Sequence, residues 1–141
     1  MIQRVQTIWL LLAAIAGFIL TRVPLYAGTL AGEALKKQYT AESLLLLAIA
    51  IIGALSALIT IFLFKNRPLQ IKLTIAGILA SVAFIAAEVS QAEKFEKSSG
   101  ILKVSYLWGA LLPVAMIVFF TLAAINIRKD NKLVKSLNRL R

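Results

Sequence analysis

Few residues in this chain of 141 amino acids have side chains suited to catalysis. The sequence contains no histidine and no cysteine, so it lacks the commonest general base, the commonest metal ligand and any thiolate nucleophile. Ser99 and Lys103 have the residue types of a Ser–Lys dyad, in which the amine would activate the hydroxyl. Because they are close neighbours in a segment rich in turn-forming residues, their spacing supports such a dyad only weakly.

The motifs of phosphate-binding loops, zinc proteases, serine hydrolases and EF-hands are also missing from the sequence. We therefore expect no catalytic residue, no cofactor-binding residue, no cofactor and no metal ligand. The sequence predicts a protein that is not an enzyme.

Glu88 is the acidic residue that lies closest to a long apolar run. Ionisable residues inside a membrane often belong to ion or proton pathways. Ser90 and Gln91 follow it, however, so we expect Glu88 to lie in water at the level of the lipid headgroups. The last three apolar runs otherwise contain no acid that could move a proton, which disfavours a channel or pump.

Long apolar runs are the elements that would position these residues. Apolar residues make up 60% of the chain, above the roughly 45–50% of an ordinary soluble domain. A membrane-spanning helix needs about 20 mainly apolar residues. We expect spans at about residues 5–21, 44–64, 69–87 and 104–127, and a tail at residues 128–141. The sequence thus predicts one all-α transmembrane domain over residues 1–141, folded as an integral membrane four-helix bundle.

Polar segments connect these runs. Residues 22–42 read as a loop that could include a short helix, and residues 88–103 read as a second loop. Residues 65–68 form a tight basic turn, because Pro68 disfavours helix at the residue before it. Pro113 is expected to bend the fourth span, and Tyr106 and Trp108 are expected to anchor its start at the membrane surface.

Charged residues divide unevenly between the connecting segments. The glutamates all lie in two of them: Glu33, Glu42, Glu88, Glu93 and Glu96. The other segments are almost purely basic and hold Arg4, Lys65, Arg67, Lys72, Arg128, Lys129, Lys132, Lys135, Arg139 and Arg141. Because Lys and Arg are enriched on the cytoplasmic side of membrane proteins, we expect both termini to be cytoplasmic and the glutamate-containing segments to lie outside.

The tail at residues 128–141 is the segment for which we expect a binding function. On a helix, its leucines and valine form one apolar stripe, and its cations lie largely off that stripe. Such a helix could bind the anionic inner leaflet or dock on a partner protein. Contact with nucleic acid is disfavoured, because the tail has no aromatic residue on which a base could stack. The predicted binding residues are Arg128, Lys129, Lys132, Leu133, Val134, Lys135, Leu137, Arg139, Leu140 and Arg141.

Small residues recur four positions apart within the apolar runs, a spacing that lets helices approach closely. The pairs are Ala13 and Gly17, Ala50 and Ala54, Gly53 and Ala57, and Gly77 and Ser81. They could pack the bundle itself or form an interface with another subunit.

Both ends of the chain resemble a domain-of-unknown-function family of small four-span inner-membrane proteins from Gram-negative bacteria. The opening Met1-Ile2-Gln3-Arg4-Val5-Gln6-Thr7 carries one part of the resemblance. The other part is the closing Ile127-Arg128-Lys129-Asp130-Asn131-Lys132-Leu133-Val134-Lys135-Ser136, followed by Arg139-Leu140-Arg141. An acidic residue is usual in that family at the position of Asn138, so a salt bridge within the tail is in doubt. The resemblance implies the fold and the bacterial inner (cytoplasmic) membrane, but no activity or ligand.

Two functions remain open at this point. The first is a non-enzymatic accessory or scaffold protein whose basic tail binds a partner protein or the anionic membrane surface. The alternative is a small transporter or lipid-handling protein with a cavity between the spans. The alternative requires polar groups that meet in the middle of the membrane, and the candidates are Ser56, Thr60, Thr74, Ser81 and Thr121.

Overall fold

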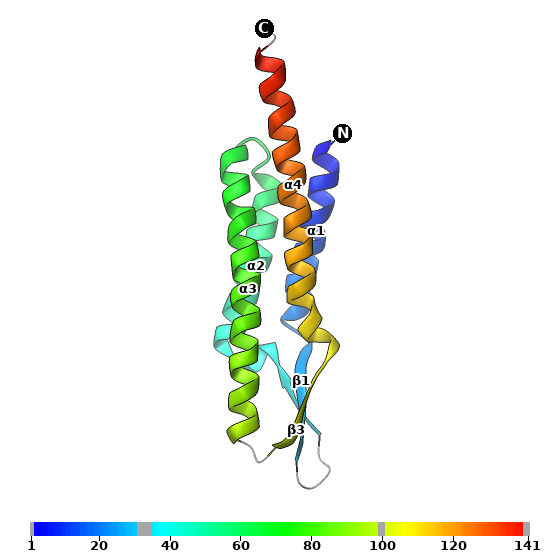
Figure 1. Ribbon diagram of the computed structural model, residues 1–141, viewed down its shortest axis with the longest axis vertical. Helices are drawn as coiled ribbons and strands as arrows, with labels where there is room; N and C mark the ends of the chain where they lie inside the picture. Colours follow the sequence, from blue (N-terminus) through cyan, green and yellow to red (C-terminus); the bar gives the residue numbers. More distant parts are fainter. Residues whose placement is uncertain (1, 31–34, 99–100, 140–141) are drawn as a thin grey trace.

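A computed structural model of the chain describes residues 2–30, 35–98 and 101–139. The helices are α1 (Ile2–Leu20), α2 (Leu44–Phe62), α3 (Arg67–Ser98) and α4 (Leu112–Arg139). The strands are β1 (Pro24–Leu30), β2 (Leu35–Tyr39) and β3 (Ile101–Tyr106), and two short 3₁₀ helices are η1 (Thr40–Glu42) and η2 (Trp108–Leu111). Figure 1 shows the helices side by side along the long axis, with the strands at the end opposite the two termini.

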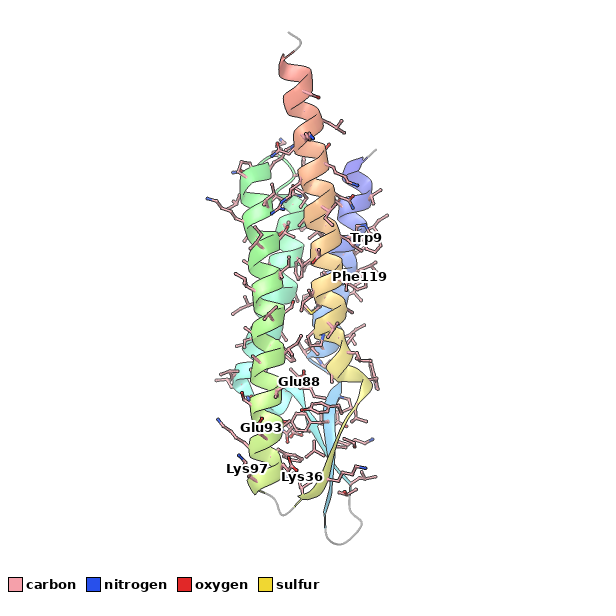
Figure 2. The ribbon with its side chains drawn as sticks, in the orientation of Figure 1. Trp9, Lys36, Glu88, Glu93, Lys97 and Phe119 are labelled. Carbon is pink, nitrogen blue, oxygen red and sulfur yellow. The ribbon has the colours of Figure 1, made fainter. Side chains whose placement is uncertain are left out.

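The four helices pack in a ring, in which α1 contacts α2 and α4, and α3 contacts the same two neighbours. Within the described ranges, three helices are long and apolar enough to cross a membrane: Leu44–Phe62, Arg67–Lys97 and Trp108–Val134. The apolar part of α1, Val5–Leu20, is shorter. On α1, Trp9 stacks on Phe119 of α4 with 6.1 Å between the ring centroids (Figure 2).

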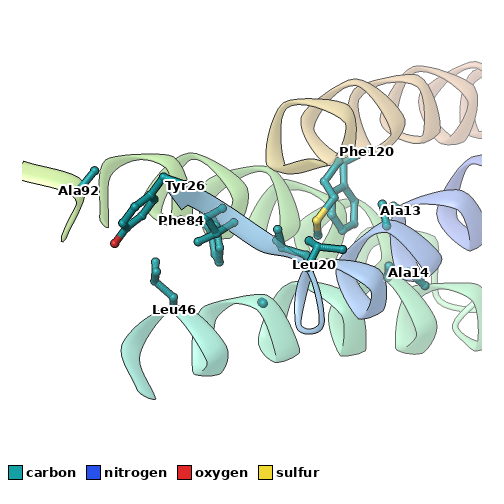
Figure 3. Close-up of a cluster of buried hydrophobic side chains, with 14 of the residues drawn as sticks. Ala13, Ala14, Leu20, Tyr26, Leu46, Phe84, Ala92 and Phe120 are labelled. Atoms are coloured by element: carbon teal, nitrogen blue, oxygen red, sulfur yellow. The ribbon is translucent and has the colours of Figure 1, made fainter. Parts of the chain in front are cut away.

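Small residues let the helices approach closely inside this ring. Gly17 of α1 lies against Ala54 of α2, whose Cβ is 2.9 Å from where a Cβ on Gly17 would stand. Gly77 of α3 similarly faces the ring of Phe120 on α4, which is fully buried. These small residues therefore pack the bundle itself. The same core continues towards the sheet through buried residues such as Leu20, Phe84 and Tyr26 (Figure 3).

The strands form an antiparallel sheet in the order β2-β1-β3. Tyr26 of β1 stands opposite Tyr106 of β3, and its ring also meets Phe95 of α3 with 5.4 Å between centroids. Gly28 of β1 leaves room for the side chains of Phe95 and Ile101. The last turns of α3 therefore cover one face of the sheet.

This sheet corrects the all-α prediction. Residues 22–42 were expected to form a loop with a short helix, but they contain the β1–β2 hairpin followed by η1. The expected loop at residues 88–103 is also wrong, because α3 continues to Ser98 and β3 begins at Ile101. Helix-favouring Glu, Gln, Ala and Lys residues extend α3, and Ala92 and Phe95 bury one side of the extension.

The fourth helix begins later than the predicted start of its span at residue 104. Residues up to Tyr106 belong to β3, so Tyr106 is exposed on the sheet rather than on a helix. Because α4 begins at Leu112, Pro113 lies in its first turn, where a missing N–H breaks no helical hydrogen bond. In this position Pro113 therefore gives no reason to expect a bend in α4.

The turn between α2 and α3 lies earlier than the predicted residues 65–68: it occupies residues 63–66, and Arg67 and Pro68 already belong to α3. Helix α2 ends at Phe62 and α3 begins at Arg67, with Pro68 in the first turn of α3. The side-chain oxygen of Asn66 accepts a hydrogen bond from the N–H of Leu69 at 3.4 Å. Proline and the asparagine cap thus define the start of α3.

Candidate functional site

The predicted binding tail is the end of α4. Helix α4 runs from Leu112 to Arg139, and among its residues with described side chains Ile127 is the last buried apolar one, with 1% of its surface exposed. In Figure 1 the end of α4 extends beyond the N-terminus and beyond the α2–α3 turn. At a rise of 1.5 Å per residue, residues 128–139 would span about 18 Å.

The tail residues whose side chains are described lie at the surface. Arg128, Lys129 and Lys132 are exposed, and Leu133 and Val134 have 49% and 36% of their surfaces exposed. The backbone of Lys135, Leu137 and Arg139 continues the helix, whereas Leu140 and Arg141 lie outside the described residues. The structure therefore leaves the described part of the apolar stripe uncovered and flanked by cations.

An ion pair joins the base of the tail to α3. The Arg67 guanidinium lies 3.2 Å from the carboxylate of Asp130, and it also donates to the Asp130 backbone carbonyl at 3.4 Å. Only 22% and 17% of these two side chains are exposed. The sequence alone did not predict a partner for Asp130. The sequence did contain a hint of this ion pair, because the tail and the basic α2–α3 turn were predicted to lie on the same side of the membrane.

The unbroken helix and this ion pair determine the direction of the tail. A helix that lies flat on a membrane surface would have to bend away from the bundle axis near residue 128. Residues 128–139 instead continue the regular helix of α4, and Arg67 holds Asp130 against the start of α3. The described part of the tail therefore continues in the direction of α4 and does not bend away at residue 128.

Glu88 is not in water, contrary to the prediction. Only 3% of its surface is exposed, because α3 continues past it and the sheet packs against the extension. Its Oε1 atom is buried and has no hydrogen-bond partner within the described part of the chain. Figure 2 shows Glu88 at the level where the helices meet the sheet, while Glu93 and Lys97 lie nearer the end of α3.

Other polar groups gather at this junction between helices and sheet. Gln91, one turn beyond Glu88, donates from Nε2 to the hydroxyl of Ser43 at 2.7 Å, and Ser43 caps the start of α2. The hydroxyl of Thr40 is buried without a partner among the described residues. Burial and, less strongly, the charge of Glu88 raise the pKa of Tyr26 to about 12. Glu88, Thr40 and Tyr26 are thus buried at this junction, beside the partly exposed pair of Gln91 and Ser43.

The hydroxyl candidates for a transport cavity each form a hydrogen bond within their own helix. Thr74, Ser81 and Thr121 donate to the carbonyls of Gln70, Gly77 and Ile117 in their own helices, at 2.8, 2.9 and 2.7 Å. Ser56 and Thr60 likewise bond to carbonyls of α2. The crevice lined by Ser81, Gly53, Phe84 and Met116 leaves no room for a water molecule.

The remaining candidates for chemistry gain no support from the structure. Across residues 2–30, 35–98 and 101–139, no group of three or more His, Cys, Asp or Glu side chains is placed to hold a metal ion. Lys103 lies on β3, and Ser99, its proposed dyad partner, lies outside the described residues.

Comparisons with known proteins place the chain in a family of unknown function. Neither the curated proteins nor the solved structures contain a significant match to it. A family match covers residues 2–140, nearly the whole chain, in agreement with the resemblance carried by its two ends. The chain therefore belongs to the family described as Domain of unknown function (DUF4293).

Proposed function

We propose that the chain is a non-enzymatic accessory or scaffold protein of the bacterial inner membrane, and that its basic tail binds a partner protein in the cytoplasm. The observation that carries the proposal is the last part of α4, which extends past the other helices with Leu133 and Val134 uncovered. Exposed Arg128, Lys129 and Lys132 surround this apolar surface. A partner with an apolar strip bordered by acidic residues would complement it.

The topology in this proposal has four membrane spans, both termini in the cytoplasm and the sheet outside. The positions of the cations support it. The N-terminal end of α1, the α2–α3 turn and the tail gather at one end of the molecule, whereas the sheet and the end of α3 lie at the other (Figure 1). The segments that the Lys and Arg count assigns to the cytoplasm are thus the segments that share one end.

A pull-down from cells under mild detergent tests the proposal, with the intact chain compared with a chain truncated after Asn131. This truncation removes Lys132, Leu133 and Val134 but keeps the Asp130–Arg67 ion pair, so the bundle retains its contact at the base of the tail. A second variant, Leu133→Asp with Val134→Asp, removes only the apolar surface. We expect both variants to lose the same partner proteins.

A matched control is Lys72→Glu, which reverses an exposed charge on α3 at the same end of the molecule. We expect this variant to keep the partners, because Lys72 is not part of the tail. If the truncated chain and the intact chain retained identical partner proteins, the proposal would be wrong. If the two tail variants kept their partner proteins but lost binding to anionic vesicles of phosphatidylglycerol, the tail would be a membrane-binding element.

A further inference from the structure

The outer edge of β3 has no partner strand among the described residues. In the sheet order β2-β1-β3, β3 pairs with β1 on its other side. The N–H of Leu107 donates to the Leu25 carbonyl at 2.8 Å. Because backbone groups alternate in direction along an antiparallel ladder, Val104 and Tyr106 direct their N–H and C=O groups away from β1. An edge of this kind can accept another strand.

A groove of about 230 Å³ runs between β3 and the last turns of α3. Lys103, Val104 and Tyr106 line it from the strand, and Ala92, Glu93 and Glu96 line it from the helix. The side chain of Tyr106 is 56% exposed, which leaves the groove open at the strand. An edge strand that faces a helix across an open groove is an arrangement suited to binding an extended peptide.

The helix wall of this groove is acidic. Glu93 and Glu96 are three residues apart and so lie on neighbouring positions of one helix face. Both side chains are exposed, and neither forms a salt bridge within the described part of the chain. Lys103 contributes one positive charge against these two negative charges, so the groove favours a ligand that carries cations.

Antiparallel pairing with the β3 strand of a second copy does not fit this edge. Figure 1 shows the strands running along the long axis of the molecule, which is also the direction of the helices. Two β3 strands that pair antiparallel would have to run in opposite directions, so the two molecules would be inverted relative to each other. Two copies inserted in one membrane with the same topology cannot meet in this way.

We propose that an extended basic peptide segment of another protein binds beside β3 as a fourth strand. Its backbone would pair with the outward groups of Val104 and Tyr106, and its Lys or Arg side chains would reach Glu93 and Glu96. Residues 103–106 offer a length of about 13 Å at 3.3 Å per residue, enough for a short segment of strand. This surface lies at the opposite end of the molecule from the tail and does not depend on it.

The test uses the full-length chain in lipid nanodiscs and a displayed library of random linear heptapeptides. We expect the selected peptides to be enriched in Lys and Arg relative to the unselected library. Methylation of single backbone nitrogens in a selected peptide should then weaken binding about 5- to 10-fold at alternate positions only, because only every second N–H faces β3. This alternation distinguishes strand addition from attraction between charges.

Two variants of the chain complete the test. The double variant Glu93→Gln and Glu96→Gln should weaken binding about 3- to 10-fold at low salt, with a smaller effect at high salt. Glu42→Gln, an exposed glutamate on η1 outside the groove, should leave binding unchanged. Failure to select any peptide, equal tolerance of methylation at every position, or unchanged binding to the double variant would each overturn the proposal.

Discussion

Replacement of the buried Glu88 by methionine should stabilise the protein. The Oε1 atom of Glu88 is buried without a hydrogen-bond partner, and only 3% of the residue is exposed. A buried polar atom without a partner costs about 1–3 kcal/mol. Methionine has a similar length and a similar helix propensity but no such atom. We therefore expect Glu88→Met to raise the free energy of unfolding by about 1–3 kcal/mol.

The free energy of unfolding can be measured by denaturant titration in detergent micelles, followed by circular dichroism. Glu88→Gln should change it less than Glu88→Met, because the amide still buries polar atoms at the same place. Glu96→Met is the matched control, since Glu96 is an exposed glutamate on the same helix. Its effect should stay within about 0.5 kcal/mol.

The sign of the change decides how Glu88 should be understood. A gain in stability would mean that Glu88 is present at this position for a reason other than stability. Substitutions that stabilise a natural protein are easy to find, so a destabilising carboxyl group is not there for lack of an alternative. A loss of more than about 1 kcal/mol would refute the reasoning. It would show that the carboxyl group makes a stabilising hydrogen bond, for example to a bound water molecule.

Three further predictions concern other contacts. A double-mutant cycle with Arg67→Gln and Asp130→Asn should give a coupling free energy of about 1 kcal/mol that decreases with salt, and zero coupling would contradict the ion pair. Gly77→Ala should lower the free energy of unfolding by about 1–3 kcal/mol because its Cβ would meet the Phe120 ring, and Phe120→Leu in the same chain should recover part of the loss. Between pH 10 and 12 the free energy of unfolding should fall by about 2–3 kcal/mol, because the pKa of Tyr26 is 10 in the unfolded chain and about 12 in the folded protein. Tyr26→Phe should remove this fall.

The helices whose cores are uncharged could be predicted closely from the sequence. The predicted span at residues 44–64 corresponds to α2, Leu44–Phe62, because a long apolar run stops at a basic turn with Pro68 just beyond it. Ser43, directly before the predicted span, caps this helix. Hydropathy and local stop signals are sufficient for such elements.

The sheet could not be predicted in the same way. Strand β1 pairs with β3, which follows it by more than 70 residues, and neither segment has a hydrophobic pattern that distinguishes it from an apolar loop or span. Val104 to Tyr106 instead continued the apolar run of the fourth span. Strand pairing between distant segments is set by tertiary packing, here by Phe95 and Tyr26, and local propensity carries little of that information.

The sequence contains a signal for the extension of α3 that the loop prediction did not use. Glu88, Ala92 and Phe95 have the spacing i, i+4 and i+7 of one helix face, and all three are buried in the structure. Reading residues 88–103 as a loop treated the glutamates alike, as markers of the outer side. Once the helix continues, its periodicity separates them: Glu88 turns towards the sheet, whereas Glu93 and Glu96 face the open groove.

At the end of the molecule that carries the tail, counting charges likewise does not show which of them are available to a partner. Arg67 adds to the positive charge that predicts the cytoplasmic side, but Asp130 pairs with it and removes it from the surface available to a partner. The cations of the tail beyond Asp130 have no acidic residue among them in the sequence. Counting charges therefore predicts orientation, whereas the binding surfaces depend on which charges the fold has already paired or buried. On that criterion, Lys129 and Lys132 at one end and Glu93 and Glu96 at the other are the charges to test first.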